Sequence, residues 1–140
     1  MVTNPTLRWV LGCGLAKIWD QRGKTLKGSS RLFTIVVSES AYLIWRLRCE
    51  WRIEREENQS KIHMREEVTN RWLALINTRL KLDCHMADKQ QYGRKAIDPT
   101  VVMRTWNSRI HNERGLPEDW IAEAGVLVGM RAGRPPGHNR

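Results

Sequence analysis

The sequence predicts an all-α fold of about four helices around one long αα-hairpin, followed by a short irregular C-terminal segment and a disordered tail. Segment 30–57 contains neither Gly nor Pro, segment 63–86 repeats apolar residues at helical steps, and a short polar stretch separates them. Two long helices joined by a short turn fold back on each other. We therefore expect one helical domain over residues 1–130 with a basic loop at 20–29, and a disordered basic tail at 131–140.

The first helix is expected near the N-terminus, where Asn4 can act as cap and Pro5 fits the first helical position. Gly12 and Gly14 weaken this segment by about 1 kcal/mol each relative to Ala, so we expect it to be broken. The Gly-Cys-Gly sequence lacks the third glycine of GxGxxG, because Lys17 stands there. This disfavours a nucleotide-binding loop and leaves close helix packing as the better interpretation.

The long segment 30–57 is the expected spine of the domain, with Ser29 or Ser30 as its N-cap. At 1.5 Å per residue, about 27 residues would span roughly 40 Å. One side of this helix is predicted from residues that recur at steps of four and three. They are Phe33, Val37, Ser40, Ile44, Leu47 and Trp51.

The second long helix is expected to start near His63, whose side chain can cap it while Glu66 occupies the third helical position. Its stripe is predicted from Val68, Trp72, Leu75, Ile76, Arg79, Leu82 and Met86. Taken with a third helix, these patterns predict a core of Phe33, Val37, Ile44, Leu47, Trp72, Leu75, Ile76, Val102 and Trp106.

The third helix has a strong start signal, because Asp98 can cap it and Pro99 pre-sets the first helical φ. Trp120 follows a Gly- and Pro-containing turn and is expected to anchor one more short helical turn. Residues 126–128 are predicted to form a terminal strand or an extended segment laid on the helices. The narrow apolar face of the third helix is Val102, Trp106 and Ile110.

The charge of +9 and the pI near 10.1 favour a polyanionic partner, RNA or DNA, bound through non-specific phosphate contacts. A solvated basic surface without a specific partner is the alternative. The cations with few acids beside them lie in the basic loop and the tail. They are the predicted nucleic-acid contacts: Lys17, Arg22, Lys24, Lys27, Arg131, Arg134 and Arg140.

No catalytic, cofactor-binding or metal-binding residue is predicted. Cys84 and His85 are adjacent, so on a helix they point about 100° apart and cannot easily share one zinc ion. Paired acids such as Glu66–Glu67 are expected on solvated faces rather than in a convergent set for metal-assisted chemistry. Trp45 and Trp51 could stack on bases, but a tryptophan at helical spacing more often belongs to the core.

Three widely spaced cysteines without a CxxC motif predict a reduced, intracellular chain, nuclear or cytoplasmic, with no disulfide framework. No continuous apolar h-region with a cleavage site opens the sequence, and no run of about eighteen apolar residues occurs. We therefore expect neither secretion nor a membrane span.

Five segments of the chain follow one another in this order: LGCGLA, SESAYLIWRLRCEWRIERE, VTNRWLALINTRLKLD, YGRKAIDPTVVMRTW and NERGLPEDWIAEAGVLVGM. Together they resemble the C-terminal extension of fungal, particularly basidiomycete, non-LTR retrotransposon proteins that carry reverse transcriptase and ribonuclease H domains. The resemblance covers most of residues 9–130. His63 and Met64 stand where a Thr-Pro helix start is expected, and Trp51 also departs from the pattern.

The resemblance implies an accessory, non-catalytic helical region, detached or truncated from a retroelement open reading frame, with Met1 fortuitous. The family's catalytic acids belong to upstream polymerase and nuclease domains, and no residue of this chain matches them. The implied partners are nucleic acid and the catalytic domains of a retroelement polyprotein. The competing interpretation is a helical protein-interaction or structural module with no nucleic-acid role.

Overall fold

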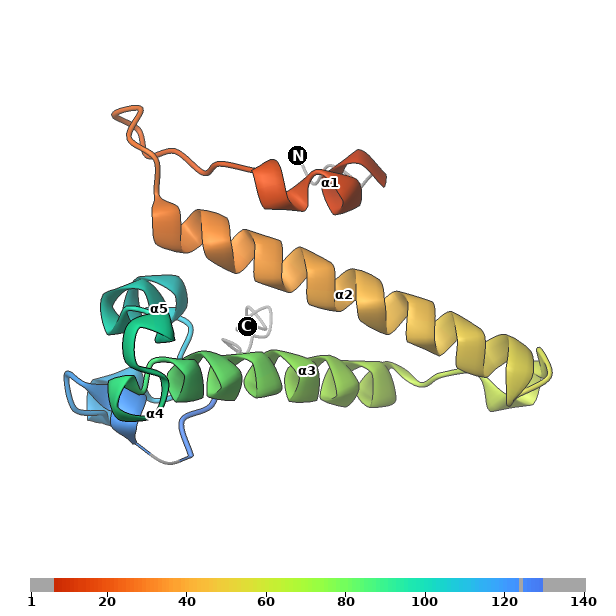
Figure 1. Ribbon diagram of the computed structural model, residues 1–140. Coiled ribbons are helices and arrows are strands. Elements are labelled where there is room, and N and C mark those ends of the chain that lie inside the picture. The colour runs from red at the N-terminus through yellow and green to blue at the C-terminus, as the bar shows by residue number, and fades with distance from the viewer. Residues whose placement is uncertain (1–6, 124, 130–140) are drawn as a thin grey trace, which may run out of the picture.

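The computed structural model describes residues 7–123 and 125–129. Its five α-helices are α1 (Leu7–Leu11), α2 (Lys27–Ile53), α3 (Arg65–Met86), α4 (Lys89–Tyr92) and α5 (Pro99–Trp106) (Figure 1). These described residues form no β-strand and contain two isolated antiparallel bridges, Trp19–Thr25 and Ile110–Val128. The prediction of an all-α fold is confirmed.

The long helices α2 and α3 form the predicted pair, joined by residues 54–64 (Figure 1). Helix α5 lies between them at the end remote from this turn, and α4 follows the end of α3. Helix α1 lies along the opposite side of α2 from α3. The hairpin therefore has a packed end, built by α2, α3 and α5, and a turn end made by α2 and α3 alone.

The hydrophobic core lies at the packed end. Val102, Trp106 and Leu80 are completely buried, and Ile76 is 1% exposed. The chain after α5 closes over the same cluster through Trp120, which is 3% exposed, so the predicted anchor is confirmed. The buried cluster consists of Ile35, Ile76, Leu80, Ala87, Val102, Trp106, Ile110, Trp120 and Val126.

A buried carboxylate joins the three helices inside this core. Asp83 of α3 is 1% exposed and accepts hydrogen bonds from both terminal nitrogens of Arg31 in α2, at 2.6 and 2.8 Å. It also accepts from the indole Nε1 of Trp106 in α5 at 2.8 Å. Arg31 donates in addition to the Thr105 hydroxyl at 3.1 Å. Removing one partner of such a buried pair typically costs about 3–5 kcal/mol, because the other charge is left uncompensated.

The predicted core is correct for Ile76, Val102 and Trp106 and wrong for Ile44, which is 67% exposed. Leu82 is also wrongly placed in the stripe of the second helix, since it is 46% exposed. The other predicted core residues, Phe33, Val37, Leu47, Trp72 and Leu75, are half-buried.

The error on α2 arises because two different sides of this helix are covered. Ile35 and Leu43, each 5% exposed, are the buried residues of α2. Phe33 instead meets Trp9 of α1, with ring centroids 6.3 Å apart. Thr34 donates a hydrogen bond to the Cys13 carbonyl at 2.8 Å, on the same side. A single apolar stripe along α2 therefore cannot describe both the side that meets α1 and the following turn and the side that carries the buried residues.

Helix α2 begins earlier than predicted, at Lys27, and neither serine caps it. Gly28 allows this extension because the α5 backbone approaches it closely: a Cβ at residue 28 would lie 2.1 Å from the Arg104 carbonyl oxygen. Ser30 binds the preceding segment instead, since its hydroxyl accepts from the Ile18 amide at 2.9 Å. Helix α2 also ends before Glu57, at Ile53.

Helix α3 begins at Arg65, and the predicted cap by His63 is wrong. Met64 occupies the N-cap position without a side-chain hydrogen bond, while the His63 ring lies near Glu67 and the Leu47 carbonyl. The start of α5 is as predicted, because the Asp98 carboxylate accepts from the Thr100 amide and Pro99 is the first helical residue.

The first segment is broken as predicted, with α1 ending before Gly12 and a 3₁₀ turn at Cys13–Leu15. Close helix packing does not explain Gly14, because a Cβ there would meet nothing within 4 Å. The predicted cap by Asn4 lies outside the described residues. Val128 in the predicted extended segment pairs with Ile110 in an isolated bridge, and its amide donates to the Asn77 side chain at 2.8 Å.

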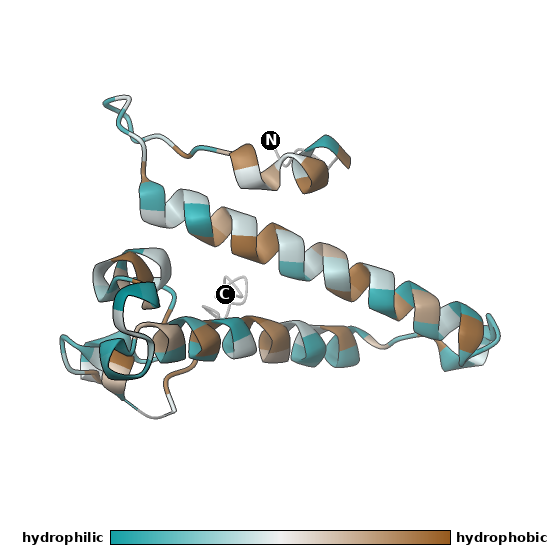
Figure 2. Cartoon of the chain, viewed as in Figure 1, coloured by the Kyte–Doolittle hydropathy of each residue, from teal (hydrophilic) through white to brown (hydrophobic). Residues whose placement is uncertain are grey.

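Hydrophobic residues along α2 and α3 alternate with hydrophilic ones rather than forming long apolar runs (Figure 2). Within the described part of the chain, none of the helices combines the length and apolar character needed to cross a bilayer.

Candidate nucleic-acid interface

The basic loop predicted at 20–29 is a tight, hydrogen-bonded turn followed by the start of α2. Trp19 pairs with Thr25, and the Asp20 carboxylate accepts from the amides of Arg22 and Lys24 at 2.9 and 2.8 Å. Gly23 has a φ of +75°, a conformation that glycine adopts readily. The only acid of the loop is thereby engaged with backbone amides, and the fold of the loop fixes where its cations emerge.

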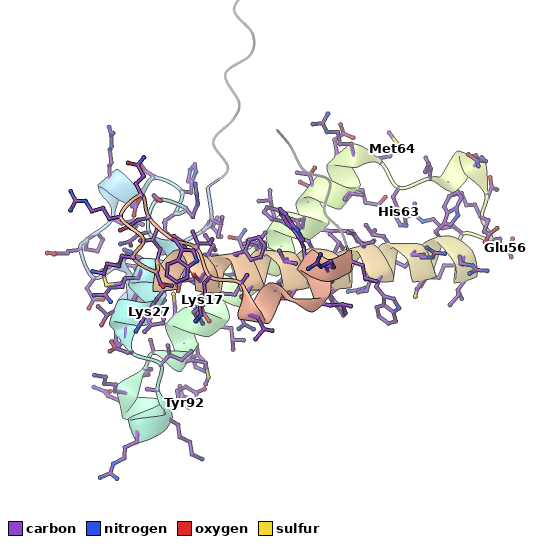
Figure 3. All side chains as sticks on the ribbon, turned by 90° about the horizontal axis from the view of Figure 1, so that it is seen from above. Lys17, Lys27, Glu56, His63, Met64 and Tyr92 are labelled. Carbon is purple, nitrogen blue, oxygen red and sulfur yellow. The ribbon has the colours of Figure 1, made fainter. Side chains whose placement is uncertain are left out.

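Four predicted contacts lie in or beside this turn. Lys17, Arg22, Lys24 and Lys27 are all exposed. Figure 3 shows Lys17 and Lys27 at the same end of the molecule, opposite Glu56 and His63. Within the described residues, none of the four cations forms an ion pair. Their positive charge is therefore not neutralised by neighbouring carboxylates.

A shallow hollow of about 470 Å³ lies beside these cations. It is lined by residues 24–29 together with Arg104, which reaches it from α5. The first turn of α2 carries no acid and no side-chain cap, so its positive helix-dipole end is not offset there. Arg104 is a further basic residue that sequence reasoning missed. The signal for it would have been the glycine at position 28, which permits the end of α5 to approach the loop.

Arg31 lies close in sequence to the basic cluster but has a different role. Its guanidinium points inward to Asp83 and Thr105 rather than outward with the lysines. The three predicted tail contacts, Arg131, Arg134 and Arg140, lie outside the described residues. The structure thus groups the four loop cations and adds Arg104 to them.

A second cluster of charged residues lies at the turn end of the hairpin. Glu50 accepts from both terminal nitrogens of Arg71, each at 2.7 Å. Glu67 accepts from Arg55 at 2.8 Å and lies 3.1 Å from His63 Nδ1. We call Glu50, Arg55, His63, Glu67 and Arg71 the turn-end network.

The pKa values of both glutamates reflect these partners. Hydrogen bonding from Arg71 holds the pKa of Glu50 below its ordinary value. The pKa of Glu67 is lowered mainly by the hydrogen bond between Glu67 and His63, and further by the hydrogen bond from Arg55. Oxygens of both carboxylates and a nitrogen of His63 lie within 4.8 Å of one another, a spacing that would suit a metal ion. The arginines, however, already occupy both carboxylates, so the donor set fits an ion-pair network better than a cation.

Cys84 and His85 do not form a nucleophilic pair. Burial raises the pKa of the Cys84 thiol to about 11, which disfavours the reactive thiolate at neutral pH. His85 instead meets Tyr92, whose hydroxyl lies 2.8 Å from its Nε2. A hollow of about 580 Å³ borders both Cys84 and His85.

These features define an all-helical, basic protein whose basic loop carries exposed cations at one end. Comparisons of the chain with protein-family models, curated proteins and solved structures give no match.

Proposed function

We propose that this chain is a non-catalytic helical module that binds nucleic acid through phosphate contacts of its basic loop, as an accessory to a retroelement polymerase. The observation that carries the proposal is a group of exposed cations that form no ion pair within the described residues. Lys24 and Lys27 line one hollow together with Arg104, and Lys17 and Arg22 lie in or beside the same turn. Phosphate contacts of this kind position a protein on a nucleic acid without reading its sequence.

The accessory role rests on the resemblance to the C-terminal extension of retrotransposon proteins. A module of this kind would add non-specific affinity for the template to the catalytic domains beside it. The hydrogen bonds of Asp20 fix the backbone of the turn before the ligand binds, which reduces the backbone entropy lost on binding.

The salt dependence of binding tests the proposal. Affinity for a random DNA duplex, an RNA–DNA hybrid and a single strand is measured between low and physiological salt. Each phosphate neutralised on a duplex contributes about 0.9 to the log–log slope. The double variant Lys24→Gln/Lys27→Gln should weaken binding and reduce the slope by about 2.

The matched control removes two exposed cations at the opposite end, Lys61→Gln/Arg65→Gln. It should leave the slope closer to that of the wild type. Equal effects of the two double variants would mean that binding follows net charge alone and not the loop.

A protein-interaction role is the second candidate, and one observation favours it. The first segment exposes three leucines to solvent: Leu7 at 72%, Leu11 at 77% and Leu15 at 87%. Exposed apolar residues grouped on one short segment are typical of a surface that packs on another protein. Absence of nucleic-acid binding at low salt would favour this role, with the catalytic domains of a polyprotein as the partner.

A further inference from the structure

The C-terminal half of α2 presents a long uncovered side. Helix α1 covers the N-terminal half of α2 on the side away from α3, through contacts to Phe33 and Thr34. Beyond α1, that side of α2 continues without another described element above it, as Figures 1 and 3 both show. Large side chains of this half of α2 remain exposed, including Ile44 at 67%, Trp45 at 62% and Ile53 at 76%.

Two aromatic rings lie next to each other on this side. Tyr42 and Trp45 are 46% and 62% exposed, and their ring centroids are 6.2 Å apart with planes inclined by 31°. The guanidinium carbon of Arg46 lies 6.0 Å from the centroid of the Tyr42 ring. The Trp45 side chain is thus not part of the core, and more than half of this residue is accessible to a ligand.

Arginines continue the same surface toward the end of the helix. Trp45, Arg48, Cys49, Arg52 and Ile53 line a hollow of about 380 Å³ with no acid in its lining. Within the described residues Arg48 forms no ion pair, and Arg52 meets only Glu57, at 3.2 Å and with both side chains largely exposed. We call Tyr42, Trp45, Arg48 and Arg52 the aromatic–arginine strip.

We propose that the aromatic–arginine strip binds a single-stranded nucleic acid, with bases stacked on Trp45 and Tyr42 and phosphates bound by Arg48 and Arg52. Exposed aromatic side chains beside exposed cations are the two components that single-strand sites combine. From Tyr42 to Arg52 the helix rises by about 15 Å, which leaves room for a few nucleotides of a single strand.

Nucleic acid suits this surface better than an acidic peptide does. A peptide carboxylate would satisfy Arg48 and Arg52 but would leave the ring faces of Tyr42 and Trp45 without a planar partner. The inference rests on the proposed function in that the ligand is a nucleic acid, yet the strip shares no residue with the basic loop. It adds a preference for unpaired bases that loop contacts to phosphate cannot give.

The test uses the full chain and three labelled probes at low salt: a single strand of about 12 nucleotides, an abasic strand of the same length, and a duplex. Trp45→Ala should weaken binding of the single strand about tenfold, because stacking on one aromatic contributes about one such factor. The same variant should leave binding of the abasic strand and of the duplex nearly unchanged. Trp45→Phe, which keeps a ring, should restore most of the affinity.

Two controls separate the strip from general effects. Ile62→Ala removes an exposed apolar side chain outside the strip and should change no affinity. Arg48→Gln should weaken binding of the single strand and of the abasic strand alike, whereas Arg94→Gln, an equal charge change near Tyr92, should weaken neither as much. Thermal melting by circular dichroism checks that each variant remains folded.

The outcomes distinguish this inference from the proposed function. If Lys24→Gln/Lys27→Gln weakens all three probes while Trp45→Ala weakens none, the strip is refuted and the loop stands. If Trp45→Ala weakens only the base-containing strand and the loop variant has no effect, the strip stands and the loop is refuted. Equal loss of the abasic strand on Trp45→Ala, or Trp45-dependent binding of poly-glutamate as tight as that of the single strand, would overturn stacking on bases.

Discussion

The two ends of the α2–α3 hairpin are both held by arginine–carboxylate pairs, yet the pairs differ in their surroundings. At the packed end, the Asp83 side chain is 2% exposed and is bound by Arg31 and Trp106. At the turn end, the Glu67 side chain is 31% exposed and that of Arg71 is 32% exposed. The Arg31 side chain is itself 25% exposed and the Glu50 side chain is 13% exposed, so the two ends differ chiefly in the burial of the carboxylates. Water therefore competes more for the turn-end contacts than for those of Asp83.

Because of this difference in burial, we expect arginine–carboxylate pairs to contribute more to stability at the packed end than at the turn end. A buried carboxylate that loses its partner leaves an uncompensated charge in the core, at a cost of about 3–5 kcal/mol. Pairs near solvent contribute about 0–1 kcal/mol, because water replaces them. We therefore expect the packed end to determine global stability and the turn end to open locally.

The largest effect is expected for Asp83→Ala, which leaves Arg31 and the Trp106 indole without their acceptor. The free energy of unfolding should fall by about 3–5 kcal/mol, measured by urea denaturation. Glu66→Ala, which removes an exposed acid from the same helix, is the matched control and should cost under about 1 kcal/mol. Equal losses for the two variants would remove the distinction between the ends.

Gly28→Ala should come next, because its Cβ would lie 2.1 Å from the Arg104 carbonyl oxygen. This oxygen belongs to the backbone, so α2 and α5 must move apart, at an expected cost of about 1–3 kcal/mol. Gly14→Ala is the control, since a Cβ there meets no atom within 4 Å. A neutral or stabilising Gly28→Ala would show that α5 does not pack against the start of α2.

A smaller effect is expected at the turn end for the Glu50–Arg71 pair. A double-mutant cycle with Glu50→Gln and Arg71→Gln should give a coupling energy of about 1 kcal/mol or less. The cycle is measured by the same urea denaturation as Asp83→Ala. A coupling equal to that of the Arg31–Asp83 pair would contradict the proposed division between the ends.

Acid should loosen the turn end. Partners lower the pKa of Glu50 and of Glu67, so the stability they contribute is present above the ordinary glutamate pKa of 4.5 and is lost as the pH falls through the lowered values. Amide resonances of residues 47–54 and 65–71 should therefore broaden or shift below about pH 4.5 in NMR spectra. The double variant Glu50→Gln/Glu67→Gln should lose this pH dependence.

Much of this fold could be predicted from local patterns in the sequence. The Asp98–Pro99 start of α5 is a two-residue signal with a direct physical cause, and Trp120 is a large apolar residue after a turn. The pairing of two long helices followed from their length and the short polar stretch between them. These features depend on neighbouring residues, which a single sequence shows.

The rest depends on contacts between distant segments. Asp83 follows the buried residues Ile76 and Leu80 at steps of four and three along α3. A single acid in such an apolar series indicates a buried ion pair. Its partner Arg31 lies 52 residues away, and sequence spacing cannot identify it. Nor could spacing show that Trp45 lies beyond the end of α1.

In the candidate sites, too, some residues could be predicted from the sequence and others only from contacts between distant segments. The loop cations were found from charge alone, because Lys17, Arg22, Lys24 and Lys27 have few acids near them in sequence. Arg104 joins them only through the packing of α5 on Gly28. The aromatic–arginine strip required knowledge of which side of α2 remains uncovered.

Hydrogen exchange of the full chain, followed residue by residue, can show directly whether the packed end determines global stability while the turn end opens locally. We expect the slowest exchange for amides of residues 31–35, 76–83 and 102–106, because these amides become accessible only when the whole domain unfolds. Amides of residues 47–53 and 65–71 should exchange much faster, through local opening of the turn end. Equal protection at the packed end and the turn end, or slower exchange at the turn end, would contradict this difference in stability between the two ends.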